Sequence, residues 1–154
     1  MHPRVPQDER FRRGPPQVPR AGLAGSVLDM SSVVVGYVPK PEGEAALVTA
    51  IAEARLRGAE LIVVNSHRAR AGDAEPDLDE VRATLESSGV VYEVRQLTRG
   101  FEAAEDLVSV AEANDAELIV IGLRRRTPVG KLILGSNAQR VLLDAHCPVL
   151  AVKA

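Results

Sequence analysis

Five short runs of aliphatic residues recur along residues 30–154, separated by stretches with helical spacing. Each run is rich in β-branched residues and apolar on both faces. This pattern is typical of strands buried in a parallel sheet rather than of half-exposed antiparallel strands. Five strands are therefore predicted, at Val33–Val38, Leu61–Ser66, Val90–Gln96, Leu118–Gly122 and Val149–Val152.

The stretches between these runs predict four helices. The first, Glu44–Arg57, is rich in alanine and ends at Gly58, a residue suited to the position that closes many helices. In each of the other three helices, apolar residues recur three and four positions apart, which predicts one buried face. The second has Leu78, Val81 and Leu85, the third has Phe101, Ala104, Leu107, Val108 and Ala111, and the fourth, which starts near Ser136, has Ala138, Val141 and Leu142.

The alternation of strands and helices predicts an α/β fold. We expect a five-stranded parallel sheet with right-handed crossovers and helices on both faces. In sheets of this kind a ligand sits beyond the carboxyl ends of the strands, at the point where the winding direction reverses. A length of 154 residues fits one such domain.

Residues 1–29 differ in composition from the rest of the chain. They hold five of the ten prolines and five arginines against three acidic residues, whereas residues 30–154 carry 14 basic and 18 acidic groups. No strand or helix periodicity runs through them, and a proline-rich polar segment buries too little surface to offset its chain entropy. We therefore expect residues 1–29 to be a disordered tail and residues 30–154 to be the folded domain.

Composition argues against several classes of partner. Aromatic residues make up 3% of the chain, too few for the stacking platforms that bind single-stranded nucleic acid, and a net charge of −2 argues against a basic surface for duplex DNA. The longest apolar runs are about six or seven residues, far below the roughly 20 that a membrane-spanning helix needs.

Cys147 is the one cysteine, which suits a reducing cytoplasm, and we expect it to be a buried structural thiol. Together with three scattered histidines (His2, His67 and His146), it supplies no metal cluster.

Candidate chemistry gathers in the segment after the fourth strand, Gly122–Ser136. It contains three glycines, including Gly130, and four basic residues, and its Gly135-Ser136 pair opens a helix. A helix N-terminus offers free backbone N–H groups and the positive end of a dipole, so this pair is a candidate seat for a phosphate. The alternative is that Ser136 only caps its helix. The consecutive arginines 124–126 fit either a phosphate clamp or a solvated loop.

This segment resembles the glycine motif of the universal stress protein family. The family pattern is Gly, two residues, Gly, nine residues, Gly and then Ser or Thr. This chain has Gly122, two residues, Arg125, nine residues, Gly135 and Ser136. The flanking residues 117–121 and 147–152, and Gly100 before the third helix, agree as well. The resemblance implies a sheet in the order 3-2-1-4-5, a dimeric protein, and in some members the binding of ATP without a dedicated reaction.

Carried over residue by residue, the resemblance assigns a ligand site that departs from the family pattern. Val38 stands where the family has a ribose-contacting Asp, Ser66 stands where it has an adenine-contacting Val, and Arg125 replaces the second glycine. Arg125 either fills the phosphate space or returns as a clamp on the phosphate. The expected ligand-binding residues are Gly122, Arg125, Gly130, Gly135, Ser136, Val38 and Ser66.

Two hypotheses about function follow. The first is a cytoplasmic stress regulator that binds ATP, AMP or another phosphorylated ligand weakly. The second is a dimeric interaction module with a vestigial pocket. We expect no enzymatic activity and no catalytic residues, because no Walker-type loop and no Gly-x-Ser-x-Gly elbow is present. We also expect a homodimer formed through the edge strand Pro148–Val152, an aliphatic strand that could pair with its own copy.

Overall fold

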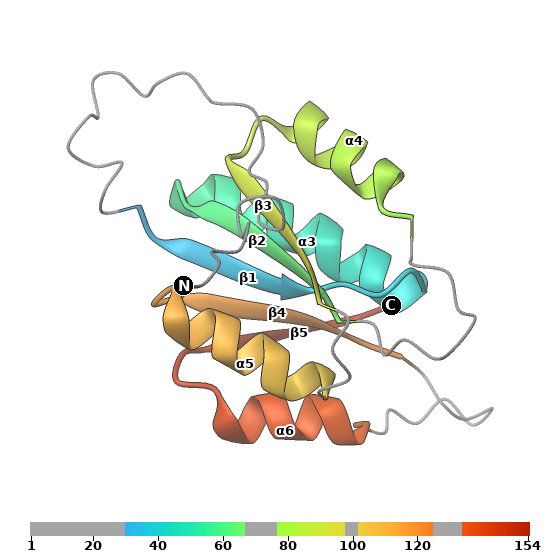
Figure 1. The fold of residues 1–154 in the computed structure, drawn as a ribbon, viewed down its shortest axis with the longest axis vertical. Helices are drawn as coiled ribbons and strands as arrows, with labels where there is room; N and C mark the ends of the chain where they lie inside the picture. The colour runs from blue at the N-terminus through green and yellow to red at the C-terminus, as the bar shows by residue number, and fades with distance from the viewer. Residues whose placement is uncertain (1–29, 67–76, 98–101, 125–133) are drawn as a thin grey trace, which may run out of the picture.

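The computed structural model describes residues 30–66, 77–97, 102–124 and 134–154, and within these ranges strands and helices alternate along the chain (Figure 1). These elements are β1 (Ser32–Gly36), α3 (Pro41–Arg57), β2 (Glu60–Ser66), α4 (Asp79–Ser88), β3 (Tyr92–Leu97), α5 (Ala103–Ala113), β4 (Leu118–Leu123), α6 (Ser136–Asp144) and β5 (Val149–Lys153). The predicted tail, residues 1–29, lies outside the described residues.

The strands form one parallel sheet in the order β3-β2-β1-β4-β5. β1 lies in the middle, because Val34 is level with Ile62 of β2 on one side and with Ile119 of β4 on the other. The chain winds from β1 outward to β3, then returns to the far side of β1 to add β4 and β5. The predicted α/β class and strand order are therefore confirmed, and the winding reverses between β1 and β4.

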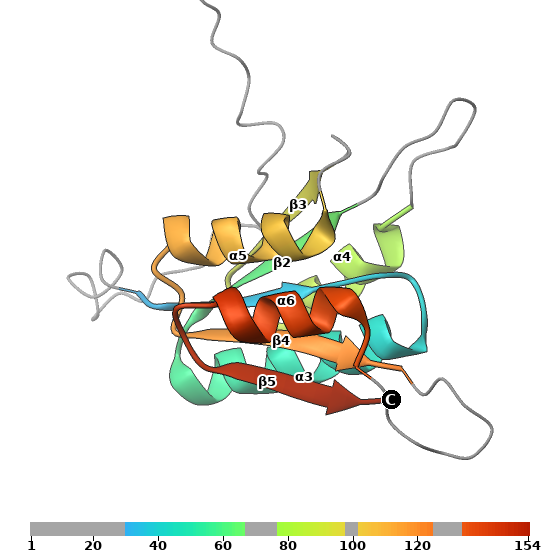
Figure 2. The same cartoon turned by 90° about the horizontal axis from the view of Figure 1, so that it is seen from below.

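Helices cover both faces of the sheet, as the two-sided apolar strands predicted. α3 and α4 lie on one face, and α5 and α6 lie on the other (Figure 2). Because side chains alternate along a strand, Val33 and Val35 of β1 pack with the α3 face while Val34 packs with the α5 face. All three are fully buried. The central strands thus join two apolar layers.

Several element boundaries differ from prediction, and those of β1, α3 and β3 differ for local reasons. β1 ends at Gly36 rather than at Val38, and α3 begins at Pro41 rather than at Glu44. The extended residue Lys40 (φ −144°, ψ 166°) precedes the helix, and Pro41 then takes the first helical position, where its missing N–H costs no hydrogen bond. β3 begins at Tyr92 rather than at Val90, because the backbone N–H of Val90 instead bonds the Ser88 hydroxyl at 3.2 Å.

Gly58 ends α3 as predicted. Its φ of 64° lies in the left-handed region, and the N–H of Ala59 bonds the carbonyl oxygen of Ala54 at 2.9 Å. This closure turns the chain directly into β2.

Candidate functional site

A cavity of about 290 Å³ opens at the carboxyl ends of β2, β1 and β4, where the winding of the sheet reverses. The first residues of α3, α5 and α6 complete its walls, so three strand ends and three helix N-termini meet around one space. Its apolar lining includes Val64, Leu107, Ile121 and Val141. The location is the one that parallel α/β sheets use for ligands, and the volume is near the lower end of ligand pockets, about 300 Å³.

Two glycines allow α3 to press against the strand ends that border this cavity. A Cβ on Gly122 of β4 would lie 2.0 Å from the carbonyl oxygen of Glu42, and a Cβ on Gly43 would lie 1.8 Å from that of Val38. Neither distance is compatible with a side chain, because the atoms met are backbone. Gly122 lines the cavity, and the structure gives it a packing role that its place in the motif did not reveal.

The polar groups of the cavity are suited to an anion. Lys40, the residue that precedes α3, and Arg124, directly after β4, both line it, with Glu42 also on the wall. In α6 the N–H of Gln139 bonds the carbonyl oxygen of Gly135 at 3.1 Å, so the N–H groups of the three residues before Gln139 precede the helical hydrogen-bond ladder. Two cationic residues and the positive end of a helix dipole therefore border the same space.

The alternative that Ser136 only caps α6 is wrong. Gly135 occupies the capping position in an extended conformation (φ −72°, ψ 169°), and no side chain caps the helix. Ser136 is the first helical residue and is exposed, while Gly135, Asn137 and Ala138 line the cavity. Glycine at the cap leaves the helix start open toward the cavity.

The two positions expected to contact a nucleoside line the cavity at the carboxyl ends of β1 and β2. Val38, a residue 36% exposed, lines the cavity beyond β1. Ser66 ends β2, and its hydroxyl donates a hydrogen bond of 2.5 Å to a carboxylate oxygen of Asp106 in α5. The expected site residues Arg125 and Gly130 lie outside the described residues.

Buried polar contacts hold the segment that leaves β1. The side-chain amide of Asn65 donates to the carbonyl oxygen of Tyr37 at 3.0 Å, and the Tyr37 N–H bonds the carbonyl oxygen of Val64 at 2.9 Å. The Tyr37 hydroxyl donates to Glu44 of α3 at 2.7 Å. Burial, together with the Glu44 carboxylate, raises the pKa of Tyr37 well above its ordinary value of 10.0. These contacts fix the chain that carries Val38 and Lys40 into the cavity.

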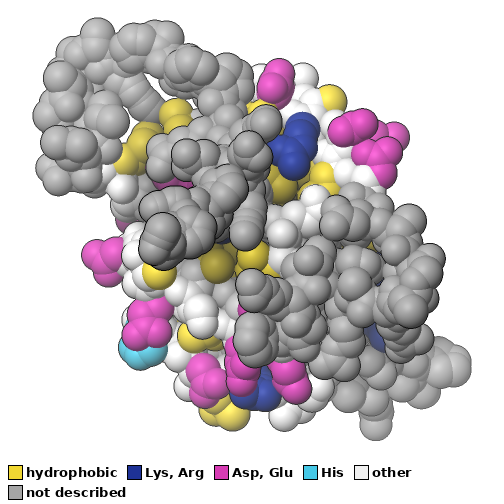
Figure 3. All heavy atoms as spheres, in the orientation of Figure 1, with side chains coloured by type: hydrophobic (Ala, Val, Ile, Leu, Met, Phe, Trp, Pro, Cys, Tyr) yellow, Lys and Arg dark blue, Asp and Glu magenta, His cyan; other side chains and the backbone are white. Residues whose placement is uncertain are grey.

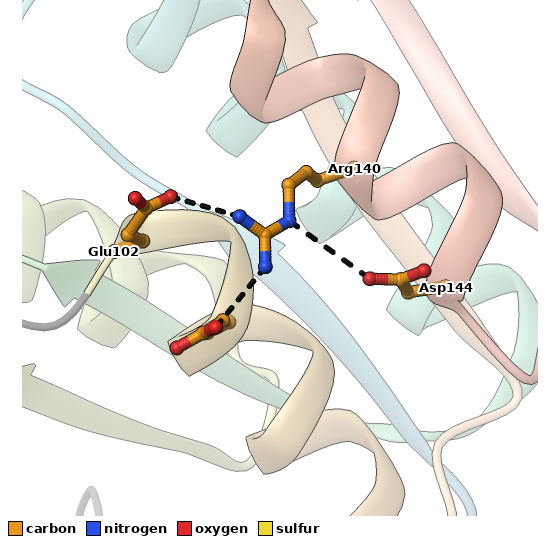
Figure 4. A network of polar contacts seen from close by, with 4 residues as sticks. Glu102, Arg140 and Asp144 are labelled. Carbon is orange, nitrogen blue, oxygen red and sulfur yellow. Dashed lines mark hydrogen bonds and ion pairs between the residues drawn. The ribbon is translucent and has the colours of Figure 1, made fainter.

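An ion-pair network joins the helices on the other side of the cavity. Arg140 of α6 contacts Glu102 at 3.1 Å and Glu105 at 3.0 Å, both at the start of α5, and lies 4.0 Å from Asp144 (Figure 4). Over α5 and α6, the molecular surface shows acidic side chains gathered around a basic one (Figure 3). The network ties together two helix starts that line the cavity.

Comparison with known proteins gives the family. The family model described as universal stress protein family matches residues 30–153. The chain belongs to the universal stress protein family. The match covers all the described strands and helices.

Relatives within the family match over most of their length. A universal stress protein of Mycolicibacterium smegmatis is 48% identical over 129 residues, covering 79% of this chain and 96% of that protein. The structure of a universal stress protein from Archaeoglobus fulgidus is 36% identical, with a TM-score of 0.63, covering 80% of this chain and 98% of that one. The structure of the Archaeoglobus fulgidus protein in complex with dAMP is 32% identical, with a TM-score of 0.57 and the same coverage.

Several cavity residues of this universal stress protein were not predicted as site residues. Lys40, Glu42 and Asn137, which line the cavity, carried no recognised signal, and neither did Asp106, the hydrogen-bond partner of Ser66. These residues share a position that could have marked them as site residues. Each lies in the first turn of a helix, or directly before it, at the carboxyl end of the parallel sheet. The strand-to-helix rule could have found them.

The described residues hold neither a metal cluster nor a membrane span. Among them, no group of three His, Cys, Asp or Glu side chains could bind a metal ion, and no helix is long and apolar enough to cross a bilayer. Cys147 is half-buried rather than fully buried as expected, and this burial raises the pKa of its thiol.

Proposed function

We propose that this universal stress protein binds an adenine nucleotide such as ATP or AMP, or another phosphorylated ligand, in the cavity at the carboxyl end of its sheet. It would act there as a cytoplasmic stress regulator, with no catalytic turnover. The observation that carries the proposal is the convergence of Lys40, Arg124 and the open start of α6 on one space.

The phosphate end of the ligand belongs at α6. A phosphate there would accept hydrogen bonds from backbone N–H groups of the first helical turn while two cations balance its charge. Gly135 has no side chain to block this approach, and Glu42 is the only acidic residue on the described cavity wall. The neighbouring family structure with dAMP supports a nucleoside monophosphate as the ligand.

The affinity should be modest. Val38 offers no hydrogen-bonding side chain where the family pattern has an Asp, and loss of one such partner costs on the order of 1 kcal/mol or more. We therefore expect binding weaker than micromolar for ATP and AMP. Small anions should still occupy the helix start.

The test is a calorimetric titration of AMP and ATP into the full chain and two variants. Arg124→Gln should weaken binding about tenfold, because one cation leaves the phosphate end. Arg82→Gln removes the same charge from α4, on the opposite face, and should leave affinity unchanged. Equal affinities for wild type and Arg124→Gln would refute the placement of the phosphate.

Two further measurements bear on the same proposal. Mass spectrometry of the denatured, purified protein should identify co-purified nucleotide, and incubation with ATP should release no phosphate above the buffer rate. Steady release of phosphate by the wild type, lost in Arg124→Gln, would contradict the proposal that the protein is not an enzyme.

A second function, a homodimeric interaction module, is favoured by the exposed edge of β5. Four residues of β5, Val149–Val152, are only half-buried in the described chain, although Leu150 and Val152 pack on the α3 face and Val149 and Ala151 on the α6 face. The Ala154 N–H bonds the carbonyl oxygen of Leu123, so by alternation the N–H groups of Val149, Ala151 and Lys153 point away from β4. An edge with free donors and apolar side chains invites a second copy.

The dimer is tested at the edge itself. Ala151→Pro removes one outward N–H without touching the hydrogen bonds to β4, and it should give monomers by light scattering. A proline placed elsewhere, such as Thr84→Pro, would not be a suitable control, because it would break the helix α4. Ala52→Lys, on the exposed side of α3, is a suitable one and should leave the mass unchanged. A dimeric Ala151→Pro variant would place the interface elsewhere.

A further inference from the structure

Lys40 is a cation of the cavity that stands on a different strand connection from Arg124. It lines the cavity together with Val38, and the chain turns tightly between them, because the N–H of Lys40 bonds the carbonyl oxygen of Val38 at 2.8 Å. The carbonyl oxygen of Lys40 accepts a hydrogen bond from the N–H of Glu44 at 2.9 Å, at the start of α3. The backbone of Lys40 is therefore held at both of its polar groups, while the residue itself is exposed.

The lining that follows β1 carries this positive charge without a carboxylate. Among the described residues, no ion pair engages the Lys40 ammonium. Glu42, the one acidic residue on the described cavity wall, starts beside β4, since a Cβ built on Gly122 would lie 3.1 Å from the Cβ of Glu42. Val38 has no hydrogen-bonding group in its side chain. A ligand group at the end of β1 therefore meets a cation and an apolar side chain.

The sheet indicates which part of a nucleotide reaches the end of β1. Arg124 follows β4, so a 5′-phosphate that it binds lies at the end of that strand. Of the two neighbours of β4, β1 contributes to the described lining and β5 does not, so the ligand extends from β4 toward β1. Parallel strands lie about 5 Å apart. The ribose is the next group after the 5′-phosphate, and one strand spacing brings its hydroxyl groups to Val38 and Lys40.

We propose that the cavity selects a nucleotide whose ribose carries a second phosphate, on its 2′- or 3′-oxygen, and that Lys40 binds this phosphate. The inference rests on the proposed function. In dinucleotide-binding folds a free ribose hydroxyl is bound by an Asp or Glu, whereas a phosphorylated ribose is bound by a nearby cation. Val38 and Lys40 match the second arrangement. In AMP, Lys40 balances the 5′-phosphate only from a distance, whereas in a bisphosphate each phosphate has a cation of its own.

Four adenine nucleotides test the proposal: AMP, ADP, adenosine 2′,5′-bisphosphate and adenosine 3′,5′-bisphosphate. ADP has as many phosphates as the bisphosphates, but both are at its 5′ end, so it controls for the number of phosphates. In calorimetric titrations at one ionic strength, the wild type should bind one of the bisphosphates about tenfold more tightly than AMP, the gain expected from one hydrogen bond to a charged group. The bisphosphate that binds more tightly identifies the ribose oxygen.

Variants of the two residues assign the preference to the end of β1. Lys40→Gln should bring the ratio of bisphosphate to AMP affinity close to one and change ADP binding much less, whereas Lys40→Arg should retain the preference. Val38→Asp supplies a carboxylate that accepts from a free ribose hydroxyl and repels a phosphate, so it should reverse the preference toward AMP. Lys153→Gln, the same change at the exposed end of β5, is the matched control and should behave as wild type.

The outcomes separate this inference from the function on which it rests. Three results overturn the role of Lys40 and leave nucleotide binding in place: equal binding of AMP and both bisphosphates by the wild type, a preference that survives in Lys40→Gln, or an equal loss of ADP and bisphosphate affinity in that variant. Failure of the wild type to bind any of these nucleotides overturns both.

Discussion

Gly122 gives a sharp test of how the cavity is built. In Gly122→Ala the new Cβ would lie 2.0 Å from the carbonyl oxygen of Glu42 and 2.7 Å from its carbonyl carbon. Ordinary contact begins near 3.4 Å, so the start of α3 must move by more than an ångström. The segment cannot yield freely, because Tyr37 is bonded to β2 and to Glu44 of the same helix.

The cost of this substitution follows from overpacking. Extra atoms in a well-packed region typically cost 1–3 kcal/mol, and a clash with backbone belongs at the upper end, about 2–3 kcal/mol. For a domain of this size, that loss lowers the melting temperature by roughly 10 °C. Urea denaturation of wild type and variant gives the free energy of unfolding directly.

Gly36→Ala is the matched control on β1. Its Cβ would meet the end of the flexible Leu107 side chain at 3.0 Å, so we expect a loss below about 1 kcal/mol. If Gly122→Ala were no less stable than Gly36→Ala, the close approach of α3 to β4 would be refuted.

Three further predictions concern the periphery of the site and the chain ends. Arg140→Gln should cost less than about 1 kcal/mol at low salt, because its ion pairs are exposed, and the difference should vanish near 1 M NaCl; a loss that persists in salt would contradict a purely electrostatic role. Tyr37→Phe should be less stable than wild type at pH 7, because it lacks the bond to Glu44. The raised pKa of Tyr37 also means that the wild type loses stability as pH rises above 10, so urea midpoints from pH 8 to 11 should fall more steeply for wild type than for Tyr37→Phe, and equal slopes would refute this. A chain that begins at Met30 should keep the melting temperature and mass of the full protein, and a drop of several degrees would show that residues 1–29 stabilise the fold.

The strands were predictable because consecutive apolar residues in the sequence indicate that both faces of a strand are buried. Val33, Val34 and Val35 are apolar on both faces, and the sheet buries both faces. Gly58 was predictable for a similar reason, since the left-handed helix end depends on one residue type. The strand order needed the family resemblance, because periodicity does not say which strands are neighbours.

The cavity was only partly predictable, since its polar groups meet across distant segments. Nothing local in the sequence pairs Ser66 with Asp106, which follows it by 40 positions. The role of Gly122 depends on the approach of α3, which brings the carbonyl oxygen of Glu42 against it from a segment 80 positions earlier in the chain. Ser136 was misassigned because Gly-Ser fits two alignments of a helix start, and the backbone adopts the one with glycine at the cap.

The central claim is that a phosphorylated nucleotide binds with its phosphate at the start of α6. The most direct measurement is an NMR titration of the full, isotope-labelled chain with AMP, following backbone amide shifts. The account predicts the largest shifts at Ser136, Asn137 and Ala138, with smaller ones at Gly122 and Ser66 and none along α4. An absence of shifts at millimolar AMP, or shifts centred on α4, would contradict it.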